Sequence, residues 1–169
     1  CDERRMKILI IHGPNLNMLG KREPGTYGNA TLEDINRSLR NLGEELDAHV
    51  DIMQSNNEAT LIDAIHGALD KRIDGIVINP GAYTHTSIAL RDALLSVNLP
   101  FIEVHISNTF ARESFRHKSY LSDVAAGVII GLGPVGYLFG MRALAQMLQV
   151  RHIAQASEGI GEKPAALTE

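Results

Sequence analysis

A carboxylate and an imidazole stand two residues apart in an otherwise apolar stretch, as Glu103 and His105 within FIEVHI. Alternate residues of a strand share a face, so the two side chains would lie side by side. A satisfied polar pair at the end of a strand is the plain interpretation, because burying a carboxylate without a partner is costly. The functional one is a histidine that Glu103 orients and keeps basic for general acid–base catalysis. The position of the pair, at a strand end, favours the second.

Three arginines indicate an anionic ligand. Arg112 and Arg116 are four residues apart in a polar segment, and Arg22 shares an N-terminal loop with Tyr27. Within that loop the residues 23–26, EPGT, fit a type II turn that would bring Arg22 and Tyr27 together. Solvated surface arginines and an ordinary surface tyrosine are the alternative. Taken together, the arginines predict a basic pocket in a mildly acidic protein.

Length and composition indicate one globular domain. The chain has 169 residues, of which 44% are hydrophobic and 21% charged, and a net charge of -4. This charge argues against a general nucleic-acid or membrane-surface role, and no apolar run approaches the ~20 residues of a membrane-spanning helix. The only cysteine is Cys1, which excludes an intrachain disulfide and a cysteine-based zinc site and suits the cytoplasm.

Apolar periodicity alternates between strands and helices along the chain. Thr31 and Asp34 form a capping-box-like start for the first helix, and Ser87 can cap the third. The strands are expected at 7–11, 48–54, 75–79, 101–106 and 128–130, and the helices at about 32–46, 61–69, 88–97 and 135–150.

This alternation predicts parallel βαβ units in a doubly wound, three-layer α/β domain, with the flavodoxin-like strand order 2-1-3-4-5. Ligands bind such sheets beyond the carboxyl ends of the strands, near the switch point. The segments that follow the first, third and fourth strands, HGPNLN, NPGAYTHTS and HISNTFARESFRH, are also the most polar in the chain. We therefore expect the site at this edge.

The two ends and the last helix give further expectations. Residues 1–5 are expected to be an N-terminal extension, residues 6–150 the single domain, and residues 151–169 a flexible tail. The last helix is apolar around most of its circumference, which predicts subunit contacts, with deep burial in the monomer as the alternative.

Several motifs match known sites only superficially. The segment GLGPVG at 131–136 matches a dinucleotide fingerprint, but no strand with an acidic residue follows it, so tight helix–strand packing explains it better. The glycine spacing of 13–21 does not fit a phosphate-binding P-loop. His12, His85 and His105 lack a carboxylate or cysteine at ligand spacing, so no metal site is predicted.

Four segments together resemble one family. They are GPNLNMLGKREPGTYG, QSNNEATLIDAIH, GIVINPGAYTHTSIALRDAL and PFIEVHISNTFARESFRHKSYLSDVAAGVIIGLGPVGY. In this order they are similar to type II 3-dehydroquinate dehydratase, over about residues 6–149. The resemblance implies dehydration of 3-dehydroquinate to 3-dehydroshikimate through an enolate, with neither cofactor nor metal, in a dodecamer of trimers. The reaction serves shikimate biosynthesis and quinate catabolism alike, so the resemblance predicts the reaction rather than the pathway.

The resemblance also implies a role for individual residues. Tyr27 corresponds to the family's base, Arg22 to the arginine that holds it as tyrosinate, and His105 to the general acid partnered by Glu103. Asn15 would hold the water that stabilises the enolate. The positions that correspond to substrate binding are Asn79, His85, Ile106, Ser107, Arg112 and Arg116, with Asp92 placed at a neighbouring subunit's site.

Two other functions compete with this one. A Schiff-base dehydratase would use a lysine, for which Lys21 and Lys118 are the candidates, and a non-catalytic flavodoxin-like module would bind a small anion without turnover. Lys118 stands where the family often has a second histidine, and Asn57 and Thr109-Phe110 also depart from common patterns. Gly20 and Gly28 are possible hinges, so residues 21–27 are predicted to form a lid that closes over substrate.

Overall fold

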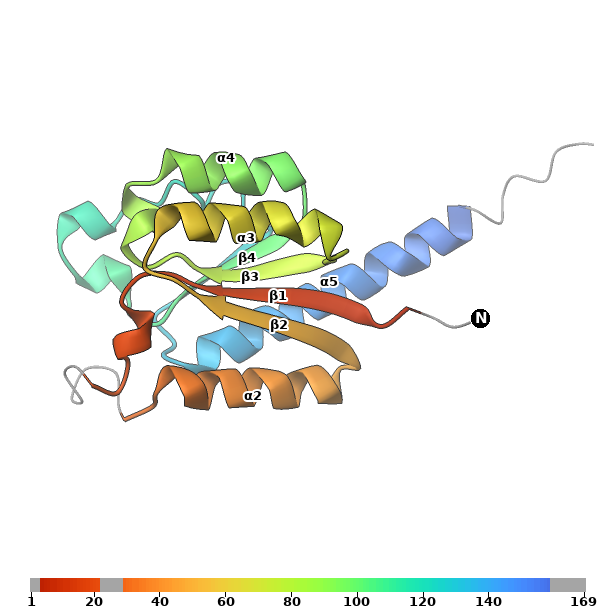
Figure 1. Ribbon diagram of the computed structural model, residues 1–169, viewed down its shortest axis with the longest axis horizontal. Helices are drawn as coiled ribbons and strands as arrows, with labels where there is room; N and C mark the ends of the chain where they lie inside the picture. The colour runs from red at the N-terminus through yellow and green to blue at the C-terminus, as the bar shows by residue number, and fades with distance from the viewer. Residues whose placement is uncertain (1–3, 22–28, 159–169) are drawn as a thin grey trace, which may run out of the picture.

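The computed structural model describes residues 4–21 and 29–158, and five parallel strands in the order β2-β1-β3-β4-β5 form its centre (Figure 1). This confirms the predicted doubly wound α/β fold. The strands are β1 (Met6–His12), β2 (Ala48–Gln54), β3 (Gly75–Asn79), β4 (Phe101–His105) and β5 (Gly127–Ile130). The helices are α2 (Leu32–Glu45), α3 (Glu58–Asp70), α4 (Ile88–Val97) and α5 (Val135–Glu158). Short 3-10 turns are η1 (Leu16–Met18), η2 (Gly81–His85), η3 (Thr109–Ala111) and η4 (Ser114–Arg116).

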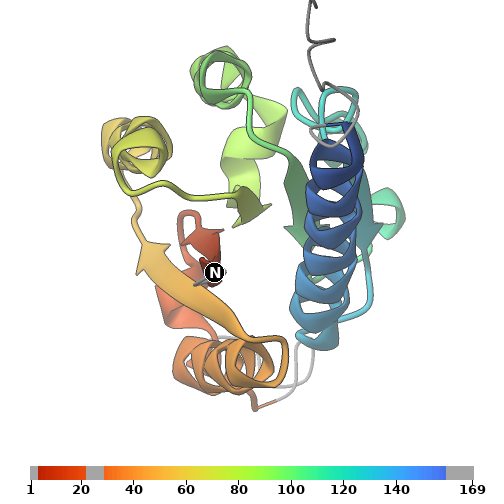
Figure 2. The same cartoon turned by 90° about the vertical axis from the view of Figure 1, so that its right-hand side faces the viewer.

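The central strands are apolar on both faces because each face is covered by a pair of helices. Ile8 and Ile10 of β1 belong to the core beneath α2 and α5, whereas Leu9 and Ile11 belong to the core beneath α3 and α4. Figure 2 shows the two pairs of helices on opposite sides of the sheet. A continuous apolar run without strand alternation is what such double coverage requires.

The two predicted helix caps are confirmed, whereas α3 begins at Glu58, three residues before the expected start. Thr31 Oγ1 accepts the backbone N–H of Asp34 at 3.2 Å, and the Asp34 carboxylate accepts the Thr31 N–H at 2.9 Å, which completes a capping box. Ser87 Oγ accepts the N–H of Leu90 at 2.9 Å and caps α4. These bonds satisfy helical N–H groups that have no partner within the helix, so they define where α2 and α4 begin.

The prediction that the last helix ends at Val150 is wrong, because α5 continues to Glu158. Tyr137, Met141 and Leu144 pack into the core, but the second half of α5 projects past the sheet (Figure 1). Within the described residues, no helix has the length and apolar character needed to cross a membrane.

Smaller boundaries also differ from expectation. β4 ends at His105, one residue before the expected end, and β5 begins at Gly127, one residue early. The sequence predicts Leu69 on the apolar stripe of α3, yet it is 53% exposed, while Ala68 in the same turn is fully buried.

Glycines in the last βα unit permit close packing, as the sequence predicts. A Cβ at Gly136 would lie 3.3 Å from Ile129, and one at Gly140 would lie 3.1 Å from Val104. Gly131, with φ of +84°, starts the turn that leads from β5 into α5. The GLGPVG segment is therefore a packing motif that brings α5 onto β4 and β5.

Candidate active site

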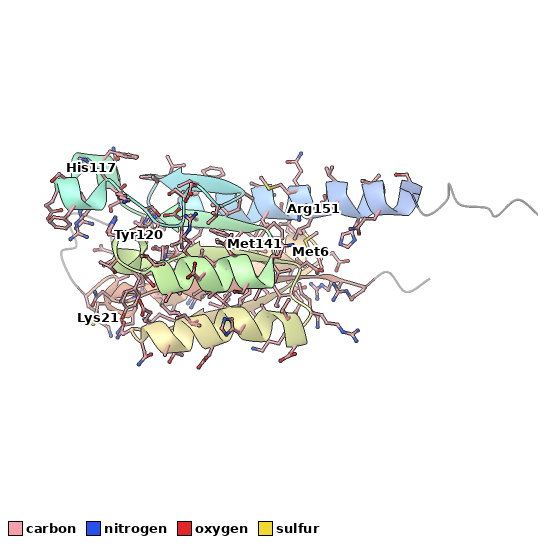
Figure 3. The ribbon with its side chains drawn as sticks, turned by 90° about the horizontal axis from the view of Figure 1, so that it is seen from above. Met6, Lys21, His117, Tyr120, Met141 and Arg151 are labelled. Carbon is pink, nitrogen blue, oxygen red and sulfur yellow. The ribbon has the colours of Figure 1, made fainter. Side chains whose placement is uncertain are left out.

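The carboxyl ends of β1, β3 and β4 meet at one edge of the sheet, at the left of Figure 1. In the strand register His12 of β1 lies beside Asn79 of β3, and Ile78 of β3 lies beside Glu103 of β4. The three polar segments that the sequence singles out leave the sheet here. Figure 3 shows Lys21 and His117 at this end of the molecule, opposite Met6 and Arg151.

The loops after β1 and β3 are packed directly against each other. Gly13 donates its N–H to the carbonyl of Asn79 at 2.8 Å, and a Cβ at Gly13 would lie only 2.5 Å from the carbonyl oxygen of Pro80. Gly81 has φ of +56°, and a Cβ there would lie 3.1 Å from the carbonyl oxygen of Pro14. Only glycine fits these positions, so the two loops form one rigid wall.

A cavity of about 350 Å³ opens between these loops and the segment after β4. Its wall next to β1 is apolar, through Leu16, Met18 and Leu19. The predicted residues that line it are Asn15, Asn79, His85, His105, Ile106, Ser107, Arg112 and Arg116. The structure thus brings eight of the twelve predicted site residues together.

The other four predicted residues lie elsewhere. Glu103 stands behind His105 and lines an adjoining cavity of about 580 Å³. Asp92 is exposed on α4 and lines neither cavity, so this subunit's own site does not contain it. Arg22 and Tyr27 fall in 22–28, outside the described residues, as do the predicted type II turn and most of the predicted lid.

The pair on β4 has the predicted geometry. His105 Nε2 lies 2.6 Å from Glu103 Oε1, with the glutamate fully buried and the histidine 7% exposed. A carboxylate only accepts hydrogen bonds, so Nε2 of His105 carries a proton and donates it to Glu103. Nδ1 is then the ring atom that remains for a ligand, and in the imidazolium form it also carries a proton.

Three hydroxyl groups complete the surroundings of Glu103. Oε1 accepts from Thr84 at 2.8 Å and from Ser119 at 2.7 Å, and Oε2 accepts from Ser122 at 2.6 Å. Burial acts to raise the pKa of Glu103, but the hydrogen bonds from His105, Ser122 and Ser119 outweigh it and lower that pKa from 4.5 to about 2. Glu103 is therefore an anion at neutral pH despite its burial.

His85 has a defined tautomer as well. Its Nδ1 lies 2.7 Å from the carbonyl oxygen of Lys118, which can only accept, so Nδ1 carries the proton. In the neutral ring Nε2 is then a hydrogen-bond acceptor available to a ligand hydroxyl.

Two arginines give the cavity its charge. Arg112 donates to Ser107 Oγ at 3.3 Å, and Arg116 donates through Nε to Glu113 at 2.8 Å. Among the described residues that line this cavity there is no carboxylate. The predicted convergence of Arg112 and Arg116 on one pocket is confirmed, and the arrangement suits a small anion with several hydroxyl groups.

His12 was considered as a metal ligand and has a different role. It is fully buried, with Nδ1 2.8 Å from the Tyr137 hydroxyl and Nε2 2.8 Å from Asn36 Oδ1. Burial lowers its pKa from 6.5 to about 4, against the raising effect of the Asn36 hydrogen bond. Across residues 4–21 and 29–158, no cluster of histidine, cysteine and carboxylate side chains fits a metal ion.

Sequence reasoning missed the hydroxyls around Glu103 and the apolar wall. Thr84, Ser119 and Ser122 are ordinary loop residues in the sequence, and only the fold brings them to β4. Leu16 and Leu19 sit in a polar-looking loop, yet they pack on the core from η1. Only Leu16 and Thr84 lie within the three polar segments that leave the carboxyl edge, whereas Leu19, Ser119 and Ser122 lie beyond them and had no such signal.

Comparisons with known proteins agree with this fold and site. A family model described as dehydroquinase class II matches residues 6–145. The 3-dehydroquinate dehydratase 1 of Pseudomonas aeruginosa is 57% identical over 142 residues, which are 84% of this chain and 97% of the relative. The 3-dehydroquinate dehydratase of Vibrio cholerae serotype O1 is 56% identical over 147 residues, 87% of this chain and 97% of the relative.

Solved structures extend the likeness to the fold. The type II dehydroquinase of Butyrivibrio crossotus superposes with a TM-score of 0.81 at 48% identity, covering 83% of this chain and 97% of that one. The type II dehydroquinase of Propionibacterium acnes gives a TM-score of 0.79 at 44% identity, covering 85% and 99%. The doubly wound fold is thus that of solved type II dehydroquinases. The chain belongs to the class II dehydroquinase family.

Proposed function

We propose that this protein dehydrates 3-dehydroquinate to 3-dehydroshikimate by elimination through an enolate, without cofactor or metal. The observation that carries the proposal is the basic cavity at the carboxyl edge, into which His105 and both arginines converge. The relatives named 3-dehydroquinate dehydratase, at 56–57% identity over almost their full length, support the same substrate.

His105 is the proton donor in this proposal, and it acts through Nδ1. Its Nε2 is engaged by Glu103 at 2.6 Å, so Nδ1 is the atom that can reach a leaving group. After a base has removed the proton α to the ketone, the enolate expels the β-hydroxyl, and His105 protonates that hydroxyl as it leaves as water. One proton is taken from carbon and one is given to oxygen, so the elimination is balanced.

The base in this proposal is Tyr27, assisted by Arg22, both in the segment outside the described residues. Generating tyrosinate at pH 7 from a reference pKa near 10 costs roughly 4 kcal/mol. A guanidinium about 4 Å away contributes a comparable ~4 kcal/mol at an effective dielectric near 20. Desolvation of the tyrosinate works against this, and a second arginine would help.

Substrate recognition follows from the remaining side chains. Arg112 and Arg116 would bind the carboxylate and hydroxyls of the anion, and His85 Nε2 would accept from a hydroxyl. Asn15, held at φ of 68° on η1, would fix the water that stabilises the enolate. Further contacts are assigned to Asn79, Ile106 and Ser107.

A cytoplasmic dodecamer of trimers, in which Asp92 reaches a neighbouring subunit's site, completes the proposal. Asp92 is exposed and lines neither cavity of its own subunit, which fits that role. Large apolar side chains on the outer face of α5 support subunit contacts: Phe139 is 51% exposed, Val150 61% and Ile153 71%.

Tyr27→Phe tests the proposal most directly. The phenyl ring keeps the shape of the side chain but removes the hydroxyl, so we expect turnover of 3-dehydroquinate to fall by about 10³-fold or more. Turnover is followed by the ultraviolet absorbance of the enone product. Tyr83→Phe is the matched control, because the Tyr83 hydroxyl donates to the carbonyl of Asn56 away from the catalytic pair. Near-normal turnover by Tyr27→Phe would remove it as the base, and an inactive wild-type protein would refute the function.

A further inference from the structure

The segment that follows η4 carries two serines whose hydroxyls donate to Glu103. Ser119 Oγ lies 2.7 Å from Oε1 and Ser122 Oγ 2.6 Å from Oε2, so the two serines bracket the carboxylate. Both hydroxyls lie on the side of Glu103 that faces the larger cavity, away from the proposed substrate cavity.

The segment that carries the two serines is held in place by a buried side chain and by backbone hydrogen bonds. Leu121, between them, is fully buried in the core beneath α3 and α4. The carbonyl of Leu121 accepts from both Val124 and Ala125, and the N–H of Tyr120 donates to the carbonyl of Thr84 at 2.8 Å. The segment is thus fixed at several points. Figure 3 shows Tyr120 at the same end of the molecule as His117.

The rotation of the Ser119 hydroxyl is fixed too. Ser119 Oγ accepts the N–H of Leu121 at 3.0 Å, and it lies 2.6 Å from the Thr84 hydroxyl. Because each hydroxyl has a single proton, Ser119 and Thr84 cannot both donate to Glu103 and also to each other. With both hydroxyls donating to Oε1, the Leu121 N–H occupies a lone pair of Ser119 Oγ and leaves the Ser119 proton to the carboxylate.

From this geometry we infer that Ser119 and Ser122 are positioning residues for the proton donor: they fix the Glu103 carboxylate, and the carboxylate in turn fixes the His105 ring. The inference rests on the proposed function of His105. Ser122 supplies the only hydrogen bond to Oε2 among the described residues, so its loss frees the carboxylate to rotate. A rotated Glu103 carboxylate no longer accepts from His105 Nε2, so the His105 ring can turn and Nδ1 no longer points at the leaving group.

Several other charged or titratable groups lie near Glu103 and would contribute to any measurement made as a function of pH. His105 is its neighbour on β4, His85 comes from η2 and Arg91 from α4. The other charged or titratable side chains that line the same cavity are Arg116, His117, Lys118, Tyr120 and Asp123. Of these groups only His105 is hydrogen-bonded to Glu103, so a change in the serines acts on this pair first.

The test is the double variant Ser119→Ala/Ser122→Ala, in the full chain. We expect kcat for 3-dehydroquinate to fall about tenfold or more while KM stays within about twofold, because the substrate contacts are untouched. Without its hydroxyl donors Glu103 takes up a proton more readily, so the titration of the Glu103 carboxyl should move to higher pH by ~1 unit. Ser119→Thr/Ser122→Thr, which keeps both hydroxyls, should restore kcat and the Glu103 titration.

Ser38→Ala is the matched control, since Ser38 Oγ donates to the carbonyl of Asp34 on the exposed face of α2. It should leave kcat and its pH profile unchanged. A double alanine variant with wild-type kcat and an unmoved Glu103 titration would overturn the inference. A merely structural role would instead lower the melting temperature without moving the Glu103 titration. If the double variant does not fold, Ser122→Ala alone is measured against the same criteria.

A second readout separates this inference from the proposed function. The carboxyl carbon of Glu103, labelled with ¹³C, reports its own ionisation by NMR without any substrate. If the wild-type protein does not turn over 3-dehydroquinate, the proposed function fails, yet the Glu103 titration still decides whether the serines hold the carboxylate. An identical titration in the wild type and the double alanine variant would refute the inference.

Discussion

Two buried histidines end two strands of the same sheet, and their partners give them opposite characters. His12 ends β1 between Tyr137 and Asn36, both neutral. His105 ends β4 against the Glu103 carboxylate, which three hydroxyls surround. Burial without a charged partner disfavours the imidazolium, whereas a carboxylate supports it. Burial lowers the pKa of His12 to about 4 and no anion stands beside it among its two hydrogen-bond partners, whereas His105 lies beside an anion and lines the cavity.

The largest expected effect is at the second of these histidines. His105→Asn should lower kcat by about 10³-fold, because the proposed proton donor is lost, while the fold persists since Glu103 keeps its hydroxyl partners. Steady-state kinetics and far-ultraviolet circular dichroism check the two parts. The control is His66→Asn on the exposed face of α3, which should be indistinguishable from wild type. If His105→Asn were as active as this control, His105 would not be the proton donor and would not differ in function from His12.

The next largest effect on activity is expected at Glu103, the partner of His105. Glu103→Gln should lower kcat by about 10²-fold, because an amide oxygen cannot replace a carboxylate that receives four donors. It should also change acid stability. The folded pKa of Glu103 is lowered, so its contribution to stability is present above about pH 4.5 and is lost as pH falls towards 2. Thermal melts across this window should show a weaker pH dependence in the variant, and an unchanged dependence would contradict the assignment.

The smallest effect on activity is expected at the first histidine. His12→Asn should leave kcat within about threefold but destabilise the fold by about 2–4 kcal/mol, from the lost ring volume and lost hydrogen bonds. The folded pKa of His12 is lowered from 6.5 to about 4, so the unfolded chain binds a proton first on acidification. The wild type therefore loses stability as pH falls from about 6.5 to about 4.

Replacing His12 should flatten this part of the stability curve, as measured by denaturant unfolding at several pH values. The window lies largely above that of Glu103, which lets the two groups be separated in one titration. A large loss of kcat in His12→Asn, with the fold intact, would show that His12 contributes to the chemistry after all.

Local signals in the sequence were sufficient for most of the fold. Thr31 with Asp34 marks the start of α2, and Ser87 marks that of α4. Such caps can be read from the sequence because a helix cap involves residues no more than four positions apart. The buried strands can be recognised in the sequence as apolar runs that end near asparagine, proline or glycine. The end of α5 was missed because residues 151–158 lack an apolar stripe, although alanine, arginine and glutamine favour helices on propensity alone.

The site was predictable where one strand carries its chemistry, as with Glu103 and His105. It was not predictable where the contact depends on distant parts of the chain. His12 is hydrogen-bonded to Tyr137, which is 125 residues away in the sequence, and Glu103 to Ser122, which is 19 residues away. No spacing in the sequence encodes such contacts, since they follow from how α5 and the loop after η4 pack on the sheet.

The strand order has a consequence for how this protein is made. Every neighbouring pair of strands is parallel, so each pairing must wait for the helix or long loop that joins the two strands to cross over the sheet. Pairings between distant segments form slowly during folding. The cavity draws on the ends of β1, β3 and β4, so it comes into existence only when nearly the whole sheet has assembled. Catalytic activity regained after dilution from denaturant should therefore lag behind helical circular dichroism.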